Sequence, residues 1–270
     1  MIQINLTQVT PSFASLFNLN APTGIRSLAV LAGGNNGKVF TDNPTHPHWG
    51  LVWEADDGTL YRGGKYDRVI LSEAVTLLRQ EGVVALGFRD GDPSVELFPP
   101  DPNAGAECLE FTRPLNNTDL SPYLGKLPAG YTIQRMDRAL LERSPKYAEN
   151  INRYGSIENL LSRGLAVCIL RGGETVCEAY ADMDIMGIRE LGVTTQEAYR
   201  GHGFATITCA YLIKLCEELG SQTYWDCVKL NKGSASVARK LGFQNQRAYK
   251  LLAWFKPNEQ PSTIKDVFDS

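Results

Sequence analysis

The sequence predicts an α/β (α+β) protein, with a mixed central sheet flanked by helices and a smaller α/β domain in front of it. Three observations support this prediction. Short apolar runs in the first half end at turn residues, a run at helical spacing follows them, and the second half shows strands and helices in regular succession. With 270 residues, 43% of them hydrophobic, the chain is long enough for two domains and apolar enough to pack both.

The first half predicts short strands and one helix. Three apolar runs each stop just before turn residues such as Gly33-Gly34, which predicts strands at 28–31, 50–54 and 60–61. The segment 69–80 carries apolar residues at helical spacing and stops before Gly82, which predicts a helix.

A linker is expected where the composition changes. The segment 113–130 is rich in Pro, Asn, Asp and Gly, residues that interrupt helices and strands. We therefore place the domain boundary near Lys126, which gives an N-terminal domain at residues 1–126 and a second domain at 127–270.

The second half has a clearer pattern. Strands are expected at 131–135, 165–170, 174–180, 188–194, 222–228 and 246–255. Helices are expected at 204–219 and 234–241, with one or two more within 138–163. A two-residue turn at Gly172-Gly173 would pair residue 171 with 174 and, counting outward, Cys168 with Cys177.

Composition excludes several classes of protein. The net charge is -3, from 27 Lys+Arg and 30 Asp+Glu, so the basic excess of a nucleic-acid binder is missing. No apolar run approaches the length of a membrane span, and the first 13 residues lack the pattern of a secretory signal, so we expect a cytoplasmic protein. The six cysteines form no C-x-x-C pair, and Cys168 and Cys177 are expected to be reduced core thiols.

A metal site is not expected. His46 and His48 could share one strand face, but no third ligand lies nearby, so a turn or surface role is the better interpretation.

One motif carries most of the chemistry. The strand that ends at Thr195 is followed by a five-residue turn (196–200), with Arg200-Gly201-His202-Gly203 opening the helix. The N–H groups at a helix start are unpaired and attract anions, and glycine lets a phosphate approach the backbone closely. The motif therefore predicts a cradle for phosphate groups.

These residues resemble the GCN5-related (GNAT) N-acetyltransferases, whose acetyl-CoA loop reads R/Q-x-x-G-x-G/A between a strand and a helix. Arg200, Gly203 and Ala205 fill its fixed positions. Asn231 and the later Leu241-Gly242-Phe243 look like the second motif of the family. The wider match, over about 131–255, is similar to a two-part bacterial subgroup with a degenerate N-terminal GNAT-like half, some of whose members acetylate amine antibiotics.

The resemblance implies a site for acetyl-CoA as co-substrate. The residues implied to hold coenzyme A are Val193, Thr194, Thr195, Arg200, Gly201, His202, Gly203, Phe204, Ala205, Asn231 and Ser234. The pyrophosphate would lie on the helix start, strand backbone would hold the pantetheine arm, and the N–H of Val193 would polarise the thioester carbonyl. His202 is expected to face phosphate or solvent rather than to act as a base.

Direct attack by an amine on the thioester needs a group that accepts a proton. Glu190 is the first choice, because it lies on the strand before the loop, where apolar neighbours would raise its pKa. The alternative is an exposed Glu or one paired with an Arg. Asp184 and Asp226 are further candidates.

The sequence offers several candidates for the general acid. The Tyr that commonly protonates the leaving thiolate in the family is replaced by Ala238, which leaves Ser234, Ser236, Tyr199, Tyr224 or water. Cys227 and Trp225 are interpreted as packing residues.

The sequence thus favours an acetyl-CoA-dependent N-acetyltransferase for a primary amine of a small polar molecule. An amine antibiotic, such as an aminoglycoside or aminopolyol, is the leading candidate, which would make the protein one of antibiotic resistance. A polyamine, an amino acid or a protein N-terminus are alternative acceptors, and a non-catalytic acyl-CoA sensor is the other class. The sequence leaves the oligomeric state open, a homodimer included.

Overall fold

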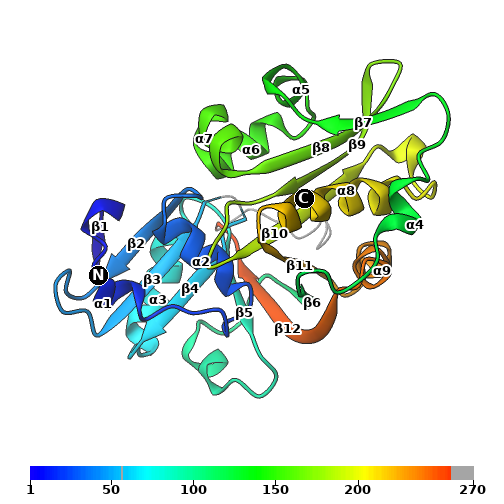
Figure 1. Cartoon of the computed structure of the whole chain (residues 1–270). Coiled ribbons are helices and arrows are strands. Elements are labelled where there is room, and N and C mark those ends of the chain that lie inside the picture. The colour runs from blue at the N-terminus through cyan, green and yellow to red at the C-terminus, as the bar shows by residue number, and fades with distance from the viewer. Residues whose placement is uncertain (56, 257–270) are drawn as a thin grey trace. The chain divides into compact units, whose positions relative to one another are not determined.

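The computed structural model describes residues 1–55 and 57–256, which divide into two compact units (Figure 1). Unit 1 contains Met1–Leu109, Val228–Leu230 and the described residues from Ala248 onward, and unit 2 contains Glu110–Cys227 and Asn231–Arg247. Strands β6 (Ala104–Arg113) and β12 (Gln244–Trp254) each give residues to both units. The domain boundary near Lys126 stays a prediction.

Unit 1 is built on an antiparallel sheet with the strand order β1-β2-β3-β4. Its strands are Ile2–Ile4, Gly37–Thr41, Trp49–Glu54 and Leu60–Gly64. Helices α1 (Pro11–Ala14) and α2 (Gly24–Leu31) share a core with Val52 on one face of the sheet. Helix α3 (Arg68–Leu78) packs with Leu51 and Trp53 on the other, because alternate residues of a strand face opposite sides. β5 (Val84–Phe88) pairs with β12 in the same unit.

The strand predicted at 28–31 is wrong, because these residues end helix α2. A run of four apolar residues does not distinguish a strand from a buried helix, and only packing decides between them. In α2, Ile25, Ala29 and Val30 are buried, and Val30 packs on the sheet. The strands expected at 50–54 and 60–61 and the helix at 69–80 are present as β3, β4 and α3, with shifts at their ends.

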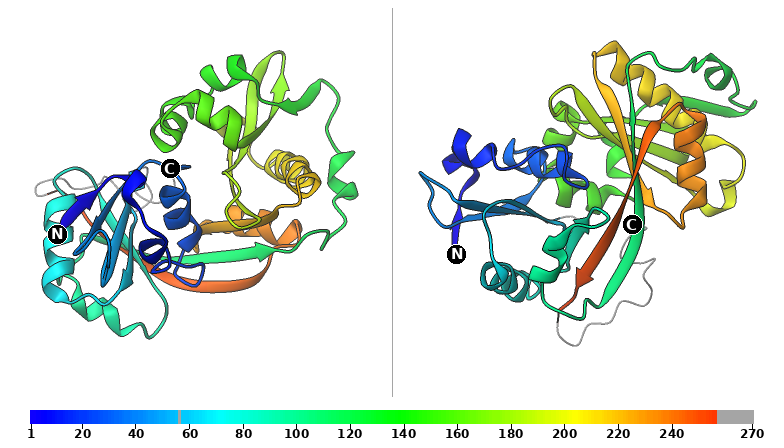
Figure 2. Two further views of the ribbon diagram at one scale, coloured as in Figure 1. Left: turned by 60° about the vertical axis from the view of Figure 1, so that its left-hand side comes forward. Right: turned by 90° about the horizontal axis from the view of Figure 1, so that it is seen from below.

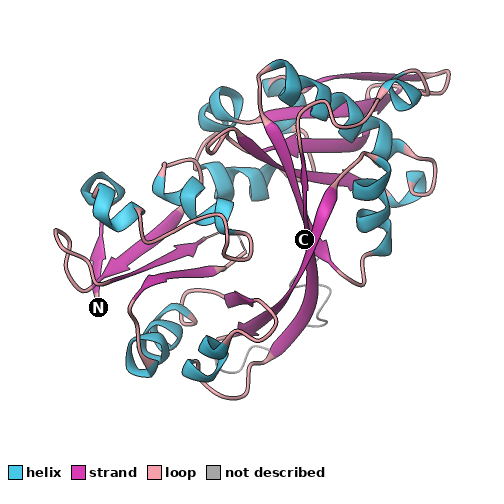
Figure 3. Ribbon diagram, turned by 60° about the horizontal axis from the view of Figure 1, so that its bottom comes forward, coloured by secondary structure: helices cyan, strands magenta, loops and turns pink. Residues whose placement is uncertain are grey.

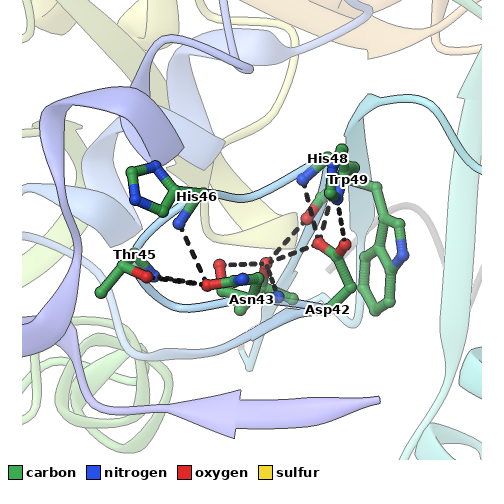
Figure 4. Close-up of polar contacts among 7 residues, drawn as sticks. Asp42, Asn43, Thr45, His46, His48 and Trp49 are labelled. Atoms are coloured by element: carbon green, nitrogen blue, oxygen red, sulfur yellow. Dashed lines mark hydrogen bonds and ion pairs between the residues drawn. The ribbon is translucent and has the colours of Figure 1, made fainter.

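A polar turn joins β2 to β3 (Figure 4). Asp42 Oδ1 accepts the backbone N–H of His48 at 3.0 Å, and Asp42 Oδ2 lies 2.6 Å from Nδ1 of the same histidine. Asn43 Oδ1 accepts the N–H groups of Thr45 and His46. Both histidines are exposed, and no group of three ligand-type side chains that could hold a metal ion is found in the described part of the chain. The turn is therefore held by its own hydrogen bonds.

This turn should make stability depend on pH. Burial raises the pKa of Asp42, but the hydrogen bonds from His48 outweigh it and lower that pKa to about 2. A depressed pKa stabilises the fold above the unfolded value of about 3.9, and this contribution is lost as the pH falls through 2. Asp42→Asn should therefore lower the melting temperature by a few degrees at pH 6, and the difference should shrink between pH 4 and 2. A constant difference over that range would contradict this assignment.

Unit 2 holds the larger part of a mixed sheet, with the strand order β12-β6-β11-β10-β9-β8-β7 (Figure 2). Its remaining strands are Tyr131–Arg135 (β7), Leu165–Arg171 (β8), Glu174–Ala181 (β9), Ile188–Thr195 (β10) and Gln222–Val228 (β11). β7 to β10 are antiparallel neighbours, whereas β10 and β11 are parallel. The fold class expected from the sequence is confirmed.

Helices cover both faces of this sheet (Figure 3). One face carries α5 (Arg138–Glu142), α6 (Tyr147–Tyr154) and α7 (Ile157–Arg163), which enclose a core with Ala166 and Cys168. The other carries α8 (Phe204–Glu218), whose Phe204 and Ile207 pack on Ile169 and Cys177. Helix α9 (Lys232–Lys240) lies between β11 and β12 in the sequence. In the described residues, no helix is long and apolar enough to cross a membrane.

The segment expected to be a linker is attached to unit 2. Its first residue, Arg113, ends β6, is buried, and donates from Nε to the carbonyl of Leu241 at 2.7 Å. Helix α4 (Ser121–Leu124) is held to α8, because Tyr211 Oη donates to the carbonyl of Leu124 at 2.9 Å. The Pro- and Gly-rich composition therefore produces a loop with a short helix that packs on the unit.

The predicted pairing of Cys168 with Cys177 is wrong. The β8–β9 register shifts between Ile169 and Leu170, so that Cys177 lies opposite Ile169 and Cys168 lies opposite Glu178. A bulge moves one strand by a residue and reverses which face each side chain takes. The two cysteines therefore lie in different cores. All six cysteines are reduced and buried, and burial raises the pKa of Cys168 to about 11.

Candidate functional site

The central feature of unit 2 is the place where β10 and β11 separate. Their parallel ladder contains only three residue pairs, from Ile188 with Gln222 to Glu190 with Tyr224. Beyond them β10 stays paired with β9 as far as Thr195. Among the residues that the structure describes, the second half of β10 thus has a strand on one side only, and its other edge is available to a ligand.

The backbone of β10 shows which groups face this opening. Asp182 N–H donates to the carbonyl of Glu190, and Gln196 N–H donates to the carbonyl of Val176, so residues 190 and 196 both turn toward β9. Polar backbone groups alternate sides along an antiparallel strand. The N–H and C=O of Val193 therefore point away from β9, into the opening.

A glycine-rich loop follows at the end of β10. Gly201 and Gly203 both have φ +81°, a left-handed conformation that favours glycine, and an added Cβ at either would meet nothing within 4 Å. Gly203 is the N-cap residue of α8 and makes no side-chain capping bond. The first N–H groups of this 15-residue helix are consequently open to an anion, at the positive end of its dipole.

The loop forms one wall of a cavity of about 270 Å³. The end of β10, the first turn of α8 and one face of α9 contribute the other residues. The cavity is lined by Thr195, Tyr199, Arg200, Gly201, Gly203, Phe204, Ala205, Thr206, Gly233, Ser236, Val237 and Lys240. This lining has two cationic side chains and no carboxylate, so it suits a ligand with several negative charges.

The structure brings together part of the set expected to hold coenzyme A. Thr195, Arg200, Gly201, Gly203, Phe204 and Ala205 line the cavity. Val193 lies on the splayed part of β10 outside the lining, and Thr194, one residue on, is exposed.

His202 lies beside the cavity rather than in its lining. Its Nδ1 is 3.0 Å from the carbonyl of Arg200, and its ring stacks on Phe204 with centroids 6.0 Å apart. Nδ1 must carry the proton to donate to a carbonyl, so the ring is fixed by the loop itself.

The second motif has a structural explanation. Asn231 caps α9, because its Oδ1 accepts the N–H of Ser234 at 3.0 Å. Ser234 Oγ accepts the indole N–H of Trp225 at 2.9 Å, and Trp225 is 2% exposed, as expected of a core residue. These contacts orient α9 against β11. Asn231 and Ser234 therefore position the helix that forms one wall of the cavity, but they do not line the cavity themselves.

Glu190 is 6% exposed and lies on the last pair before the strands separate. Register partners share a face of a sheet, so Glu190 and Tyr224 both point toward the side opposite α8. Tyr154 of α6 lies on this side as well, and its hydroxyl donates to Asp182. Glu190 is therefore a buried carboxylate at the inner end of the opening.

The other candidate bases differ in position. Asp226 follows Tyr224 by two residues, so it shares the face of Glu190 and lies on the β11 side of the opening. Asp184 lies in the turn before β10, where it accepts the N–H of Gly187 at 2.7 Å and the hydroxyl of Ser221. At about 3.3 Å per residue, that turn is more than about 20 Å from the glycine loop, so the contacts of Asp184 favour a structural role.

Tyr224 is held as a neutral phenol. Burial raises its pKa well above the ordinary value, and the carboxylates of Asp226 and Glu110 add to this effect. Its hydroxyl donates to Glu110 Oε2 at 2.7 Å, and Glu110 also pairs with Arg247 at 2.7 Å. A phenol whose proton is already bound to a carboxylate is a poor donor to a thiolate. Ala238, at the position where the family commonly has Tyr, is fully buried.

Four lining residues were not expected from the sequence: Thr206, Gly233, Val237 and Lys240. The sequence contained part of the pattern that identifies them. The three- and four-residue spacing of one helix face is found in Gly233, Ser236, Val237 and Lys240. Only the packing of α9 near α8 shows that this face lines a cavity.

Comparisons with known proteins show the family and the fold of the chain. A family model described as GNAT acetyltransferase matches residues 104–252, more than half of the chain. The chain is 29% identical over 128 residues to the uncharacterized N-acetyltransferase YdfB of Bacillus subtilis strain 168; the match covers 47% of this chain and spans about half (49%) of that relative.

Solved structures share the fold over a greater length. A GCN5-related N-acetyltransferase-like protein from Streptococcus suis 89/1591 superposes with a TM-score of 0.67 at 22% identity, covering 88% of this chain and 96% of that one. A tandem GNAT protein from the clavulanic acid biosynthesis pathway gives a TM-score of 0.58 at 12% identity, covering 92% of each chain. At these identities the likeness concerns the fold alone.

Proposed function

Since the chain belongs to the GNAT acetyltransferase family, we propose that it transfers an acetyl group from acetyl-CoA to a primary amine of a small polar molecule. The observation that carries this proposal is the opening between β10 and β11, which leads to the uncapped start of α8. This arrangement offers an extended edge for the pantetheine arm and a cradle for the pyrophosphate in one continuous site.

The donor fits the residues present. Arg200 and the N–H groups at the start of α8 would bind the pyrophosphate, while the Gly201 and Gly203 positions leave room for it. The N–H of Val193, which faces the opening, would donate to the thioester oxygen as that oxygen gains negative charge. These groups position the donor and do not react with it.

The amine must lose a proton to attack the thioester carbon. Glu190 would accept that proton, the new C–N bond would form as the C–S bond breaks, and the thiolate of coenzyme A would leave and take up a proton. A thiolate is stable enough near neutral pH to leave without a dedicated acid. The burial of Glu190 and the commitment of Tyr224 to Glu110 support this division of roles.

The acceptor is proposed to be cationic. Glu190 lies at the inner end of the opening, and Asp226 adds a carboxylate on the β11 side. Amine antibiotics, aminoglycosides and aminopolyols among them, are therefore the first acceptors to test, followed by polyamines, amino acids and peptide N-termini. The buried Ala238 supports a second candidate, a sensor that binds acyl-CoA without turnover.

One experiment separates the enzyme from the sensor. Calorimetry with acetyl-CoA should show binding, and release of free thiol should then be followed over a panel of amines at pH 8. Turnover with at least one amine supports the transferase. Binding without turnover on every amine of the panel supports the sensor, and the absence of binding refutes both.

A further inference from the structure

The cavity has a cationic side chain on each of its two walls. Arg200 stands in the glycine loop, and Lys240 stands in the last turn of α9. Lys240 is exposed, and no carboxylate of the described residues lies within ion-pair distance of its ammonium. Its backbone is fixed, because Tyr123 Oη donates to its carbonyl at 3.1 Å. A cation is thus held at the cavity without an internal partner.

The glycine loop provides for one anionic group only. The start of α8 and Arg200 form a single cradle, which the pyrophosphate of the donor would fill. Coenzyme A carries a second anion, the 3′-phosphate on the same ribose that bears the pyrophosphate. Lys240, on the wall opposite Arg200, provides a second positive charge for this second phosphate, and the cavity lining has no carboxylate that would repel it.

We propose that Lys240 binds the 3′-phosphate of coenzyme A and thereby makes the protein select a free 3′-phosphorylated acyl-CoA as donor. Donors that lack this phosphate, such as dephospho-CoA or an acyl group on carrier-protein phosphopantetheine, would lose the contact. The inference rests on the proposed function, since it assigns one part of the donor to one residue of the same site. Ser236 and Gly233, one and two turns earlier on α9, leave a path along this wall to Lys240.

Another role for Lys240 is purely structural, because a cation in the last turn of a helix interacts favourably with the helix dipole. The two roles differ in what they predict for ligands. A structural role affects every donor alike, whereas a phosphate contact affects only donors that carry the 3′-phosphate.

The test compares Lys240→Gln with Lys232→Gln, an exposed lysine of the same helix that does not line the cavity. Affinities for acetyl-CoA and acetyl-dephospho-CoA are measured by calorimetry. The wild type should prefer acetyl-CoA by about tenfold or more, as expected for one charge-assisted contact. Lys240→Gln should lose this preference, because its affinity for acetyl-CoA falls while its affinity for acetyl-dephospho-CoA is unchanged. Lys232→Gln and Lys240→Arg should keep the preference.

The inference is overturned if the wild type binds both donors with equal affinity, or if Lys240→Gln lowers the affinity for both donors to the same extent. Its failure is distinct from that of the proposed function. A protein that binds acetyl-CoA with the expected preference but acetylates no amine would refute the transferase and retain the assignment of Lys240.

Discussion

Glu190→Gln should lower the turnover number by about 100-fold or more, while the affinity for acetyl-CoA changes little. Glutamine has nearly the same size and cannot accept a proton, and loss of a general base typically costs 10²- to 10⁴-fold. Because Glu190 lies at the inner end of the opening and not in the cavity lining, the cofactor contacts should be preserved. Steady-state kinetics with the best acceptor and calorimetry with acetyl-CoA measure the two quantities.

The pH profile tells a lost base from a disturbed site. At high pH the amine is deprotonated in solution and needs no base, so Glu190→Gln should recover part of its activity above pH 9. The control is Glu178→Gln, which replaces a buried carboxylate on the same face that accepts hydrogen bonds from Ser144. Glu178→Gln should lower the stability of the fold, and its turnover should not recover at high pH. Unchanged turnover of Glu190→Gln would remove Glu190 from the mechanism.

Gly203→Asp should weaken binding of acetyl-CoA by about 10- to 100-fold, because it places a carboxylate where the pyrophosphate would lie. The matched control is Gly203→Asn, which has the same shape without the charge. Both residues tolerate the left-handed conformation at φ +81° better than other side chains, so they share the backbone cost. The difference between the two variants therefore reports the charge alone.

Calorimetry and thermal unfolding of both variants provide the measurement. Similar melting temperatures with a much weaker affinity of the Asp variant support the cradle. Equal affinities of the two variants would show that no anion is bound at the start of α8.

The second half of the chain was predictable because its elements have strong local signals. The helix at 204–218 begins after a glycine loop and ends just before Gly220, and both ends follow from local backbone preferences. The glycine loop could be located for the same reason, because it consists of consecutive residues. Residues 28–31 offered only four apolar side chains, and packing against β3 made them helical.

Register and catalytic geometry could not be predicted in this way. The pairing of Cys168 with Cys177 failed because a bulge shifts the hairpin by one residue, and turn counting has no access to it. Asp184, Glu190 and Asp226 are equal as carboxylates in the sequence. The fold distinguishes them: Asp184 closes a turn, Glu190 lies at the inner end of the opening, and Asp226 lies on the β11 side of the opening.

By itself the sequence determined the local elements of the second half, the glycine loop at 200–205 and the family that they indicate, because these depend on residues near one another in the chain. The tertiary structure alone decided where β10 leaves β11, that Tyr224 is bound to Glu110, and that Lys240 reaches the cavity of the glycine loop. Each of these depends on residues distant in sequence, whose contacts are set by the packing of strands and helices.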